Sequence, residues 1–261
     1  MIIGLYLQGG GAKGAFEAGA LYALLKKGIK FNIVSGTSVG SVNGYYIYTN
    51  NLYKLKDLYT EDDLFDETQK SYIKNTIPNN HFIRRLADLN GINKDVQKFY
   101  VNYTHIADKQ MNEIRKDLTT LTKEEAIDCI NYSSSLPYVI NDGREKIRFS
   151  EITDDFKSSE VMDEFNKKFQ IGKFNNMNLD GGILNNEFME PFVENKVDKL
   201  YLISVSNSFK VPKFIKDTYR PEDIILIHRD SLYSSSDSMN YNKNFLKSLF
   251  KEGYDKALEK L

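Results

Sequence analysis

The chain has 261 residues, 41% hydrophobic and 27% charged, which is typical of one large globular domain. Lysine and arginine total 35 against 36 aspartate and glutamate residues, so the net charge of -1 gives no overall attraction to nucleic acid. Cys129 is the one cysteine, which excludes an intramolecular disulfide, and its helix-like surroundings predict a buried thiol.

The N-terminal residues have neither the charged segment nor the apolar segment of a secretion signal. No stretch approaches the roughly 18 uncharged apolar residues that a membrane-spanning helix requires. We therefore expect a cytoplasmic protein. The sequence specifies no oligomeric state.

Two strand-helix units are expected within the first fifty residues. The apolar run MIIGLYL predicts a buried strand, and three-four spacing predicts a helix from Gly14 to Lys27, stopped by Gly28. The run IKFNIVSG predicts a second strand, followed by a helix from Ser38 to about Tyr48. This alternation indicates a parallel sheet covered by helices.

The middle of the chain, from about Asn50 to Leu118, is charged and aromatic, and we expect it to be mostly helical. We interpret about 50–120 as a cap-like insertion outside the sheet. Its segment HFIRRLADL combines basic and apolar side chains in a way that suits contact with a membrane surface. A solvated helix packed on the core explains the same composition. These side chains are Phe82, Ile83, Arg84, Arg85, Leu86 and Leu89.

The second half predicts further elements of both kinds. A helix over KEEAIDCINY, a hairpin turn at Asp142-Gly143 and a short helix over VMDEFNKKF come first. Strands are expected at 199–206 and 223–228, the second almost entirely apolar, as in a buried parallel strand. An amphipathic helix closes the sequence, and we expect its apolar stripe to face the core rather than a membrane.

The pentapeptide GTSVG matches the G-x-S-x-G nucleophile elbow, with Ser38 at its centre. In such an elbow a strand turns sharply into a helix, and Gly36 and Gly40 remove side chains that would clash there. The serine hydroxyl then lies exposed at the edge of the sheet, over the positive end of the helix. An inert serine in a tight turn is the alternative.

A glycine-rich loop, GGGAKG, follows the first strand. No acidic residue follows at the distance that a dinucleotide fingerprint requires, and the P-loop pattern is absent, although a nucleotide-binding module remains an alternative. Beside a serine elbow, such a loop favours a set of backbone N–H groups that stabilise an oxyanion. These residues are Gly9, Gly10, Gly11, Ala12, Lys13 and Gly14, with Lys13 adding positive potential.

A nucleophilic serine needs a base, and two kinds are present. Of the three histidines, His81 and His105 are expected on the surface, whereas His228 ends an apolar strand, where sheet enzymes place catalytic groups. A carboxylate is the other choice, and Asp180 precedes Gly181 and Gly182, which allow a tight turn and a close approach to its side chain. The residues alone leave both choices open.

Three motifs in this order resemble the patatin-like phospholipases. That family has G-G-G-x-[RK]-G after the first strand, G-x-S-x-G after the second, and D-G-[AG] downstream, here at 9–14, 36–40 and 180–182. The stretches SSSLPYVI and DGGILNN extend the resemblance. Glu187 stands where the family often has proline, and the stretch from Pro137 to Asp180 is long, which leaves the pocket mouth and the lipid preference undefined.

The resemblance implies a three-layer α/β/α fold with a mostly parallel central sheet over one domain, residues 1–261. It also implies hydrolysis of phospholipid or related lipid esters by a Ser38–Asp180 dyad without histidine, metal or cofactor. The expected partner is a lipid ester, with peripheral membrane contact as a further expectation. A thioesterase, a general carboxylesterase and a non-catalytic lipid-binding protein are the alternatives.

Overall fold

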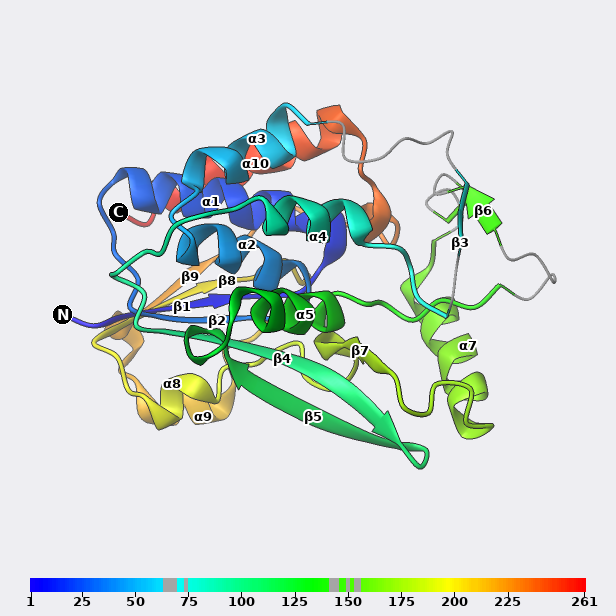
Figure 1. Cartoon of the computed structure of the whole chain (residues 1–261). Coiled ribbons are helices and arrows are strands. Elements are labelled where there is room, and N and C mark those ends of the chain that lie inside the picture. The colour runs from blue at the N-terminus through cyan, green and yellow to red at the C-terminus, as the bar shows by residue number, and fades with distance from the viewer. Residues whose placement is uncertain (63–69, 73–74, 141–145, 149–150, 153–155) are drawn as a thin grey trace.

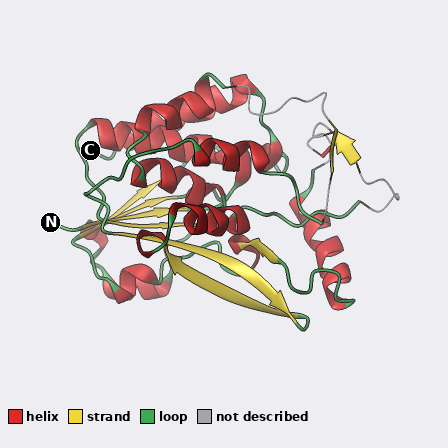
Figure 2. Cartoon of the chain, viewed as in Figure 1, coloured by secondary structure: helices red, strands yellow, loops and turns green. Residues whose placement is uncertain are grey.

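A seven-stranded sheet crosses the middle of the computed structural model, which describes residues 1–62, 70–72, 75–140, 146–148, 151–152 and 156–261 (Figures 1 and 2). The expected turn at Asp142-Gly143 lies outside the described residues. Along the sheet the strands are β5 (Gln110–Asp117), β4 (Lys98–Ala107), β2 (Ile33–Gly36), β1 (Ile3–Leu7), β8 (Lys199–Ile203) and β9 (Ile224–Ile227), and β7 (Asn178–Asp180) pairs with β4.

The five strands from β4 to β9 along this path are parallel, and only β5 and β7 run antiparallel to β4. Strand β1 is fully buried, as its apolar sequence predicts. Its alternating side chains enter two separate cores, because Leu5 and Leu7 pack on one face of the sheet and Tyr6 packs on the other. The expected mostly parallel central sheet is confirmed.

Helices cover both faces of the sheet, which confirms the three-layer arrangement (Figure 1). The larger layer comprises α1 (Gly14–Lys26), α2 (Val39–Tyr48), α3 (Leu52–Thr60), α4 (Asn80–Ala87), α5 (Lys123–Ser133) and α10 (Lys243–Leu258). The opposite face carries the short helices α8 (Pro191–Glu194) and α9 (Lys213–Thr218).

A third group of elements lies beyond the carboxyl ends of the parallel strands, at the right of Figure 1. It consists of α7 (Ser158–Gln170) and a two-stranded antiparallel sheet of β3 (Lys70–Tyr72) and β6 (Lys146–Arg148). These segments lie on the side of the sheet at which β1 and β2 end and the two glycine-rich turns begin (Figure 1).

The expectation of a mostly helical segment up to Leu118 is wrong for its last third. Residues 98–117 form the β4–β5 hairpin, and β4 belongs to the central sheet. The hairpin turn is made by Asp108 and Lys109, both with positive φ (50° and 57°), rather than by the Asn-Gly or Asp-Gly pair that usually signals such a turn. Helices α3 and α4 occupy the earlier part, as expected.

The apolar side chains of α4 face the protein interior. Phe82 and Leu86 are buried in the main core, as is Leu89 just after the helix, and Arg85 pairs with Asp62 at 2.9 Å between Nε and Oδ2. This helix therefore does not present the apolar membrane face that its composition suggested. Among the helices of the described residues, none is both long enough and apolar enough to cross a bilayer.

Two further expectations about burial hold. The Cys129 side chain is buried within α5, as its sequence surroundings indicated. The apolar stripe of α10 faces the core, where Leu246, Leu249 and Phe250 are at most 7% exposed.

Helices α1 and α10 touch through their backbones. A Cβ atom at Gly19 would lie 1.9 Å from the Phe250 carbonyl oxygen, and one at Gly253 would lie 1.9 Å from the Phe16 carbonyl oxygen. The contact is reciprocal, because each helix offers a glycine to the backbone of the other. Helix α1, which starts at the glycine-rich loop, is thereby fixed in place by α10.

We predict that Gly19→Ala destabilises the protein by about 2–3 kcal/mol or more, since overpacking at this contact forces the two helix backbones apart. Ser248→Ala, on the exposed face of α10, is the matched control and should change stability by at most about 0.5 kcal/mol. Urea unfolding monitored by circular dichroism measures both. Equal midpoints for the two variants would contradict the close contact.

Candidate active site

Ser38 occupies a strained turn between β2 and α2. Its backbone has φ 54° and ψ −127°, a conformation that residues other than glycine rarely adopt. A Cβ at Gly36 would lie 2.7 Å from the Gly40 carbonyl oxygen, and one at Gly40 would lie 2.5 Å from that of Leu7. Both glycines are therefore required for the elbow to close, as the motif predicts.

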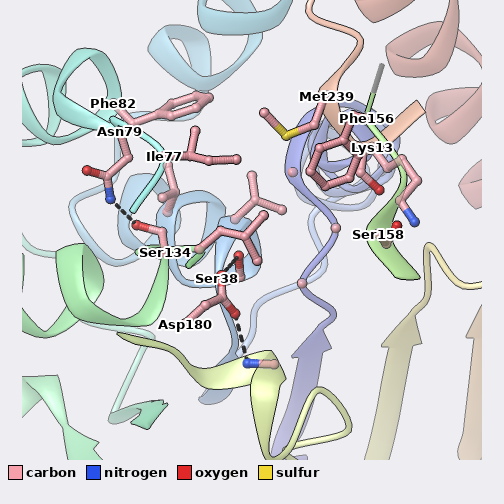
Figure 3. A pocket seen from close by; sticks show the side chains of 18 of the residues that line it. Lys13, Ser38, Ile77, Asn79, Phe82, Ser134, Phe156, Ser158, Asp180 and Met239 are labelled. Carbon is pink, nitrogen blue, oxygen red and sulfur yellow. Dashed lines mark hydrogen bonds between the residues drawn. The ribbon is translucent and has the colours of Figure 1, made fainter. Parts of the chain in front are cut away.

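Asp180 ends β7 and faces Ser38 (Figure 3). The Ser38 hydroxyl donates a hydrogen bond to Asp180 Oδ2 at 2.6 Å. The second carboxylate oxygen, Oδ1, accepts the backbone N–H of Gly182 at 2.8 Å, and the side chain is 5% exposed. The structure thus brings together two residues that lie far apart in the sequence.

Asn102, in β4, connects the serine elbow to the turn after Asp180. Its Oδ1 accepts the hydroxyl of Thr37 at 2.7 Å, and its Nδ2 donates to the Asn185 carbonyl oxygen at 2.8 Å. A Cβ at Gly181 would lie 2.5 Å from the Asn102 carbonyl oxygen, so the turn packs directly against this strand. One buried side chain therefore sets the spacing of the two turns.

The glycine-rich loop lies on the other side of Ser38. The Gly9 N–H donates to Asn186 Oδ1 at 3.0 Å, and Asn186 Nδ2 donates back to the Gly9 carbonyl at 3.1 Å. Gly11 has φ 58°, so the chain turns there in a way that favours glycine. A Cβ at Gly11 would lie 2.2 Å from the Ser238 carbonyl oxygen.

Only some N–H groups of this loop remain available for a ligand. Those of Gly9, Lys13 and Gly14 donate to acceptors within the protein. Among the described residues, the N–H groups of Gly10 and Gly11 have no acceptor, and both residues line the cavity next to Ser38. The Ala12 N–H also has no acceptor among the described residues, but Ala12 does not line the cavity, so Gly10 and Gly11 have the donors that an oxyanion site requires.

Lys13 is directed to a structural contact. Its Nζ donates to the Val205 carbonyl oxygen at 3.0 Å and lies 5.0 Å from the centre of the Tyr233 ring. Burial lowers the pKa of Lys13, while Asp237 and Glu17 favour its charged form. The lysine thus anchors the loop to the segment after β8.

A cavity of about 290 Å³ opens beside Ser38 and Asp180 (Figure 3). Its walls come from the glycine-rich loop, the start of α2, the segment before α4, the segment after α5, α7 and the segment before α10. More than half of the lining side chains are apolar or aromatic: Val39, Val42, Ile77, Pro78, Phe82, Leu136, Phe156, Met162, Ile183, Met239 and Tyr241. The site combines a polar reacting end with an apolar chamber.

The three histidines are placed differently from one another. His228 is exposed at the end of β9, where Nδ1 lies 2.7 Å from the Arg229 carbonyl oxygen, and it does not line the cavity. His105 lies on β4, with Nδ1 2.8 Å from Asn178 Oδ1. His81 was expected on the surface but lines the cavity, and burial together with Arg85 lowers its pKa to about 3, so the ring is neutral.

Comparison with known proteins decides the family. The family sequence model described as patatin-like phospholipase matches residues 5–193, which is most of the chain. The chain belongs to this family. Its patatin-like region contains both glycine-rich turns and Asp180.

Relatives of this patatin-like protein match only locally. A patatin-like phospholipase domain-containing protein of Caenorhabditis elegans is 54% identical over 48 residues, which is 18% of this chain and 4% of the relative. A lysophospholipase, nte1, of Aspergillus terreus is 48% identical over 42 residues, 16% of this chain and 3% of the relative. The chain therefore matches only a small part of these curated relatives.

A solved structure supports the fold over the whole patatin-like chain. The crystal structure of VipD from Legionella pneumophila superimposes with a TM-score of 0.51 at 12% sequence identity. The match covers 99% of this chain and 66% of VipD. At this identity the likeness concerns the fold.

Asn102 and Asn186 are the positions in this patatin-like site that motif reasoning missed. Asn186 stands in DGGILNN and exchanges two hydrogen bonds with Gly9, but nothing in the sequence pairs positions so distant. Asn102 lies in the strand that was expected to be helical. Asn102 is buried directly after the buried Val101, so the alternation of apolar residues in this strand does not signal its burial.

Burial of Asp180 alters its acidity. Desolvation raises the pKa of Asp180 to about 6, although the hydrogen bonds from Ser38 and the Gly182 N–H favour the ionised form. In the unfolded chain an aspartate titrates near pH 3.9. The folded patatin-like protein thus binds this proton more tightly, so the contribution of Asp180 to stability is full below about pH 4 and is lost as the pH rises through about 6.

We predict that this ionisation lowers the free energy of unfolding by about 2 kcal/mol between pH 4 and pH 6.5. Asp180→Asn cannot ionise, so its stability relative to wild type should rise by this amount over the interval. Asp163→Asn, at an exposed position of α7, is the control. Urea unfolding across the pH range measures the free energy of unfolding of each variant. If Asp180→Asn showed the same pH dependence as wild type, as the control should, the assignment would be contradicted.

Proposed function

We propose that this protein is a serine acyl hydrolase that cleaves ester bonds of phospholipids or related lipids. Ser38 acts as the nucleophile, Asp180 as the general base, and the N–H groups of Gly10 and Gly11 as the oxyanion hole. The observation that carries the proposal is the 2.6 Å hydrogen bond from Ser38 Oγ to Asp180 Oδ2 beside an apolar cavity. Membership of the patatin-like family supports the same reaction.

The first half of the reaction forms an acyl-enzyme. Ser38 Oγ attacks the ester carbonyl carbon while its proton passes to Asp180 Oδ2, the oxygen that it already contacts. The carbonyl oxygen becomes negatively charged and is bound by the free N–H groups of the loop. The carbon–oxygen bond to the alcohol then breaks, and Asp180 returns the proton to the leaving oxygen.

The second half releases the fatty acid. Asp180 takes a proton from a water molecule, whose oxygen attacks the acyl carbon of the Ser38 ester. The same N–H groups bind the second oxyanion, and the proton on Asp180 returns to Ser38 Oγ as the acyl–serine bond breaks. The raised pKa of Asp180 makes it a stronger base than an exposed aspartate, which favours both proton transfers.

The cavity supports a lipid as substrate. Its side chains are mainly aliphatic, aromatic or methionine, and they start directly beside the serine, so an acyl chain would lose its hydration on entering. A relative's name, lysophospholipase, points to the same class of ester. Since the chain matches only 3% of that relative, the head group and the acyl chain length have to be measured on this protein itself.

Ser38→Ala and Asp180→Asn should each lower kcat for ester hydrolysis by at least about 10³-fold, because each removes a group that reacts directly. His228→Ala should stay within about twofold of wild type, because this exposed residue is remote from the cavity. Turnover of a p-nitrophenyl ester tests all three, with circular dichroism to establish folding. An inactive but folded His228→Ala would favour a Ser-Asp-His triad instead.

The same proteins separate an enzyme from a lipid-binding protein. A fluorophosphonate probe should label wild type and His228→Ala but not Ser38→Ala. Failure to label wild type, alongside a labelled control hydrolase, would contradict the proposal. A panel of phospholipid, lysophospholipid, triglyceride, thioester and short p-nitrophenyl ester substrates then distinguishes a lipase from a thioesterase or a general carboxylesterase.

We predict that Met239→Trp shortens the preferred acyl chain. The Met239 side chain is 4% exposed and lines the cavity with Ile77 and Phe156. The indole ring of tryptophan is larger than the methionine side chain and would fill part of the space for the acyl chain. The kcat/KM ratio of a dodecanoyl to a butanoyl ester should fall about tenfold or more. Met239→Leu keeps the volume and should keep the ratio. An unchanged ratio in both would exclude this cavity as the acyl site.

A further inference from the structure

Glu17, in α1, is a fully buried carboxyl group with unequal surroundings for its two oxygens. Its side chain has 0% exposure. Oε2 accepts the side-chain amide of Asn43 at 3.0 Å, and the backbone N–H of Gln8 also donates to the carboxyl group. Among the described residues, Oε1 is buried and has no hydrogen-bond partner.

These surroundings disfavour a carboxylate. A buried negative charge requires a cation or several donors, and one oxygen of Glu17 has neither. The nearest cation is Lys13, but its Nζ is bound to the Val205 carbonyl, and no ion pair joins it to Glu17 among the described residues. Burial raises the pKa of Glu17 well above its ordinary value, more than its two hydrogen bonds and Lys13 lower it.

Asn43, the partner of Glu17, connects the helices that follow the two catalytic turns. It lies in α2, behind Ser38, and its Nδ2 also donates to the Gly14 carbonyl at 3.0 Å. Its Oδ1 accepts the hydroxyl of Tyr59, from α3, at 2.9 Å. Gln8, the other partner of Glu17, immediately precedes the glycine-rich loop. The carboxyl group thus bridges the start of that loop and the helix behind the nucleophile.

We propose that Glu17 is a positioning residue whose neutral carboxyl group fixes the glycine-rich loop relative to the Ser38 elbow. The inference rests on the proposed hydrolase function and deepens it. The donors at Gly10 and Gly11 stabilise an oxyanion only if they point to one side of Ser38 Oγ. Glu17 adds to the contacts of Gly9 and Lys13 that already hold this loop. Ionised Glu17 would draw solvent or shift the helices, and the donors would lose their alignment.

Within the part of the chain that the structure describes, one lysine and three tyrosines are the titratable groups that face Glu17. Lys13 precedes it on the loop, and the hydroxyl-bearing rings of Tyr6, Tyr59 and Tyr233 come from β1, α3 and the segment after β9. Burial raises the pKa of each tyrosine, so these rings stay neutral while Glu17 titrates. Burial lowers the pKa of Lys13, so this lysine also titrates in the alkaline range, and the infrared band of the carboxyl group is needed to assign the titration to Glu17.

The decisive experiment compares Glu17→Gln, Glu17→Ala and Leu21→Ala in ester hydrolysis across pH. Glutamine keeps the shape and the acceptor, so it should retain most of the kcat and abolish the alkaline decline of wild type. Alanine should lower kcat by about 10²-fold with KM nearly unchanged, as loss of an oxyanion donor does. Leu21→Ala, also fully buried in α1, is a matched control that loses stability but keeps kcat.

A second measurement observes the proton without requiring turnover. The infrared band of a protonated carboxyl group should persist in wild type at pH 8, where Asp180 is ionised, and should be missing from Glu17→Gln. The folded protein holds this proton more tightly than the unfolded chain, so wild type should lose stability relative to Glu17→Gln as the pH rises above about 4.3.

The outcomes separate this inference from the proposed function. If wild type hydrolyses no ester, the proposed function fails. The infrared band and the unfolding curves still test whether the buried carboxyl group of Glu17 is protonated. A missing band, a pH-independent stability difference, or a Glu17→Gln variant as impaired as Glu17→Ala would overturn the inference. Should Glu17→Ala fail to fold, the glutamine variant and the infrared band decide it.

Discussion

The hydrogen bond from Ser38 to Asp180 depends on strand β4, which is the shared neighbour of both residues. β4 pairs in parallel with β2, which leads into Ser38, and antiparallel with β7, which ends at Asp180. Asn102 of this strand binds both turns through its side chain. Two residues that are distant in the sequence therefore meet because one strand fixes the register of each, and the cavity and the loop are arranged around that meeting point.

Sequence reasoning reached the family and the candidate site because these depend on local turn chemistry. A strained elbow at Ser38 needs glycines at fixed offsets, and the turn after Asp180 needs small residues against a neighbouring strand. The residues that meet these requirements lie within a few positions of Ser38 or Asp180 in the sequence. The buried strands β1 and β8 were likewise visible, since a strand covered on both faces must be largely apolar. Strand β9 was also found from its apolar sequence, but the expectation that it is buried is wrong, because it lies at the edge of the sheet and three of its four residues are half-buried.

What the sequence did not disclose depends on contacts between distant segments. The alternation of buried and half-buried positions in β4 is interrupted at Val101 and Asn102, which are both buried. Its charged partner β5 and a turn without glycine further conceal the hairpin. Helix α4 has the composition of a surface-binding helix, and only the packing of Phe82 and Leu86 shows that its apolar face is enclosed. The pairing of Asn186 with Gly9 has no local signature at all.

The reciprocal backbone contact between α1 and α10 has a consequence for the order of synthesis and folding. Gly19 and Phe250 stand near opposite ends of the described chain, yet α1 carries the glycine-rich loop. On the ribosome, α1 emerges before α10, and the elements between them are made before the two helices can meet. Contacts of such long sequence separation close slowly. A nascent chain would therefore complete the support behind the glycine-rich loop only after α10 has been made.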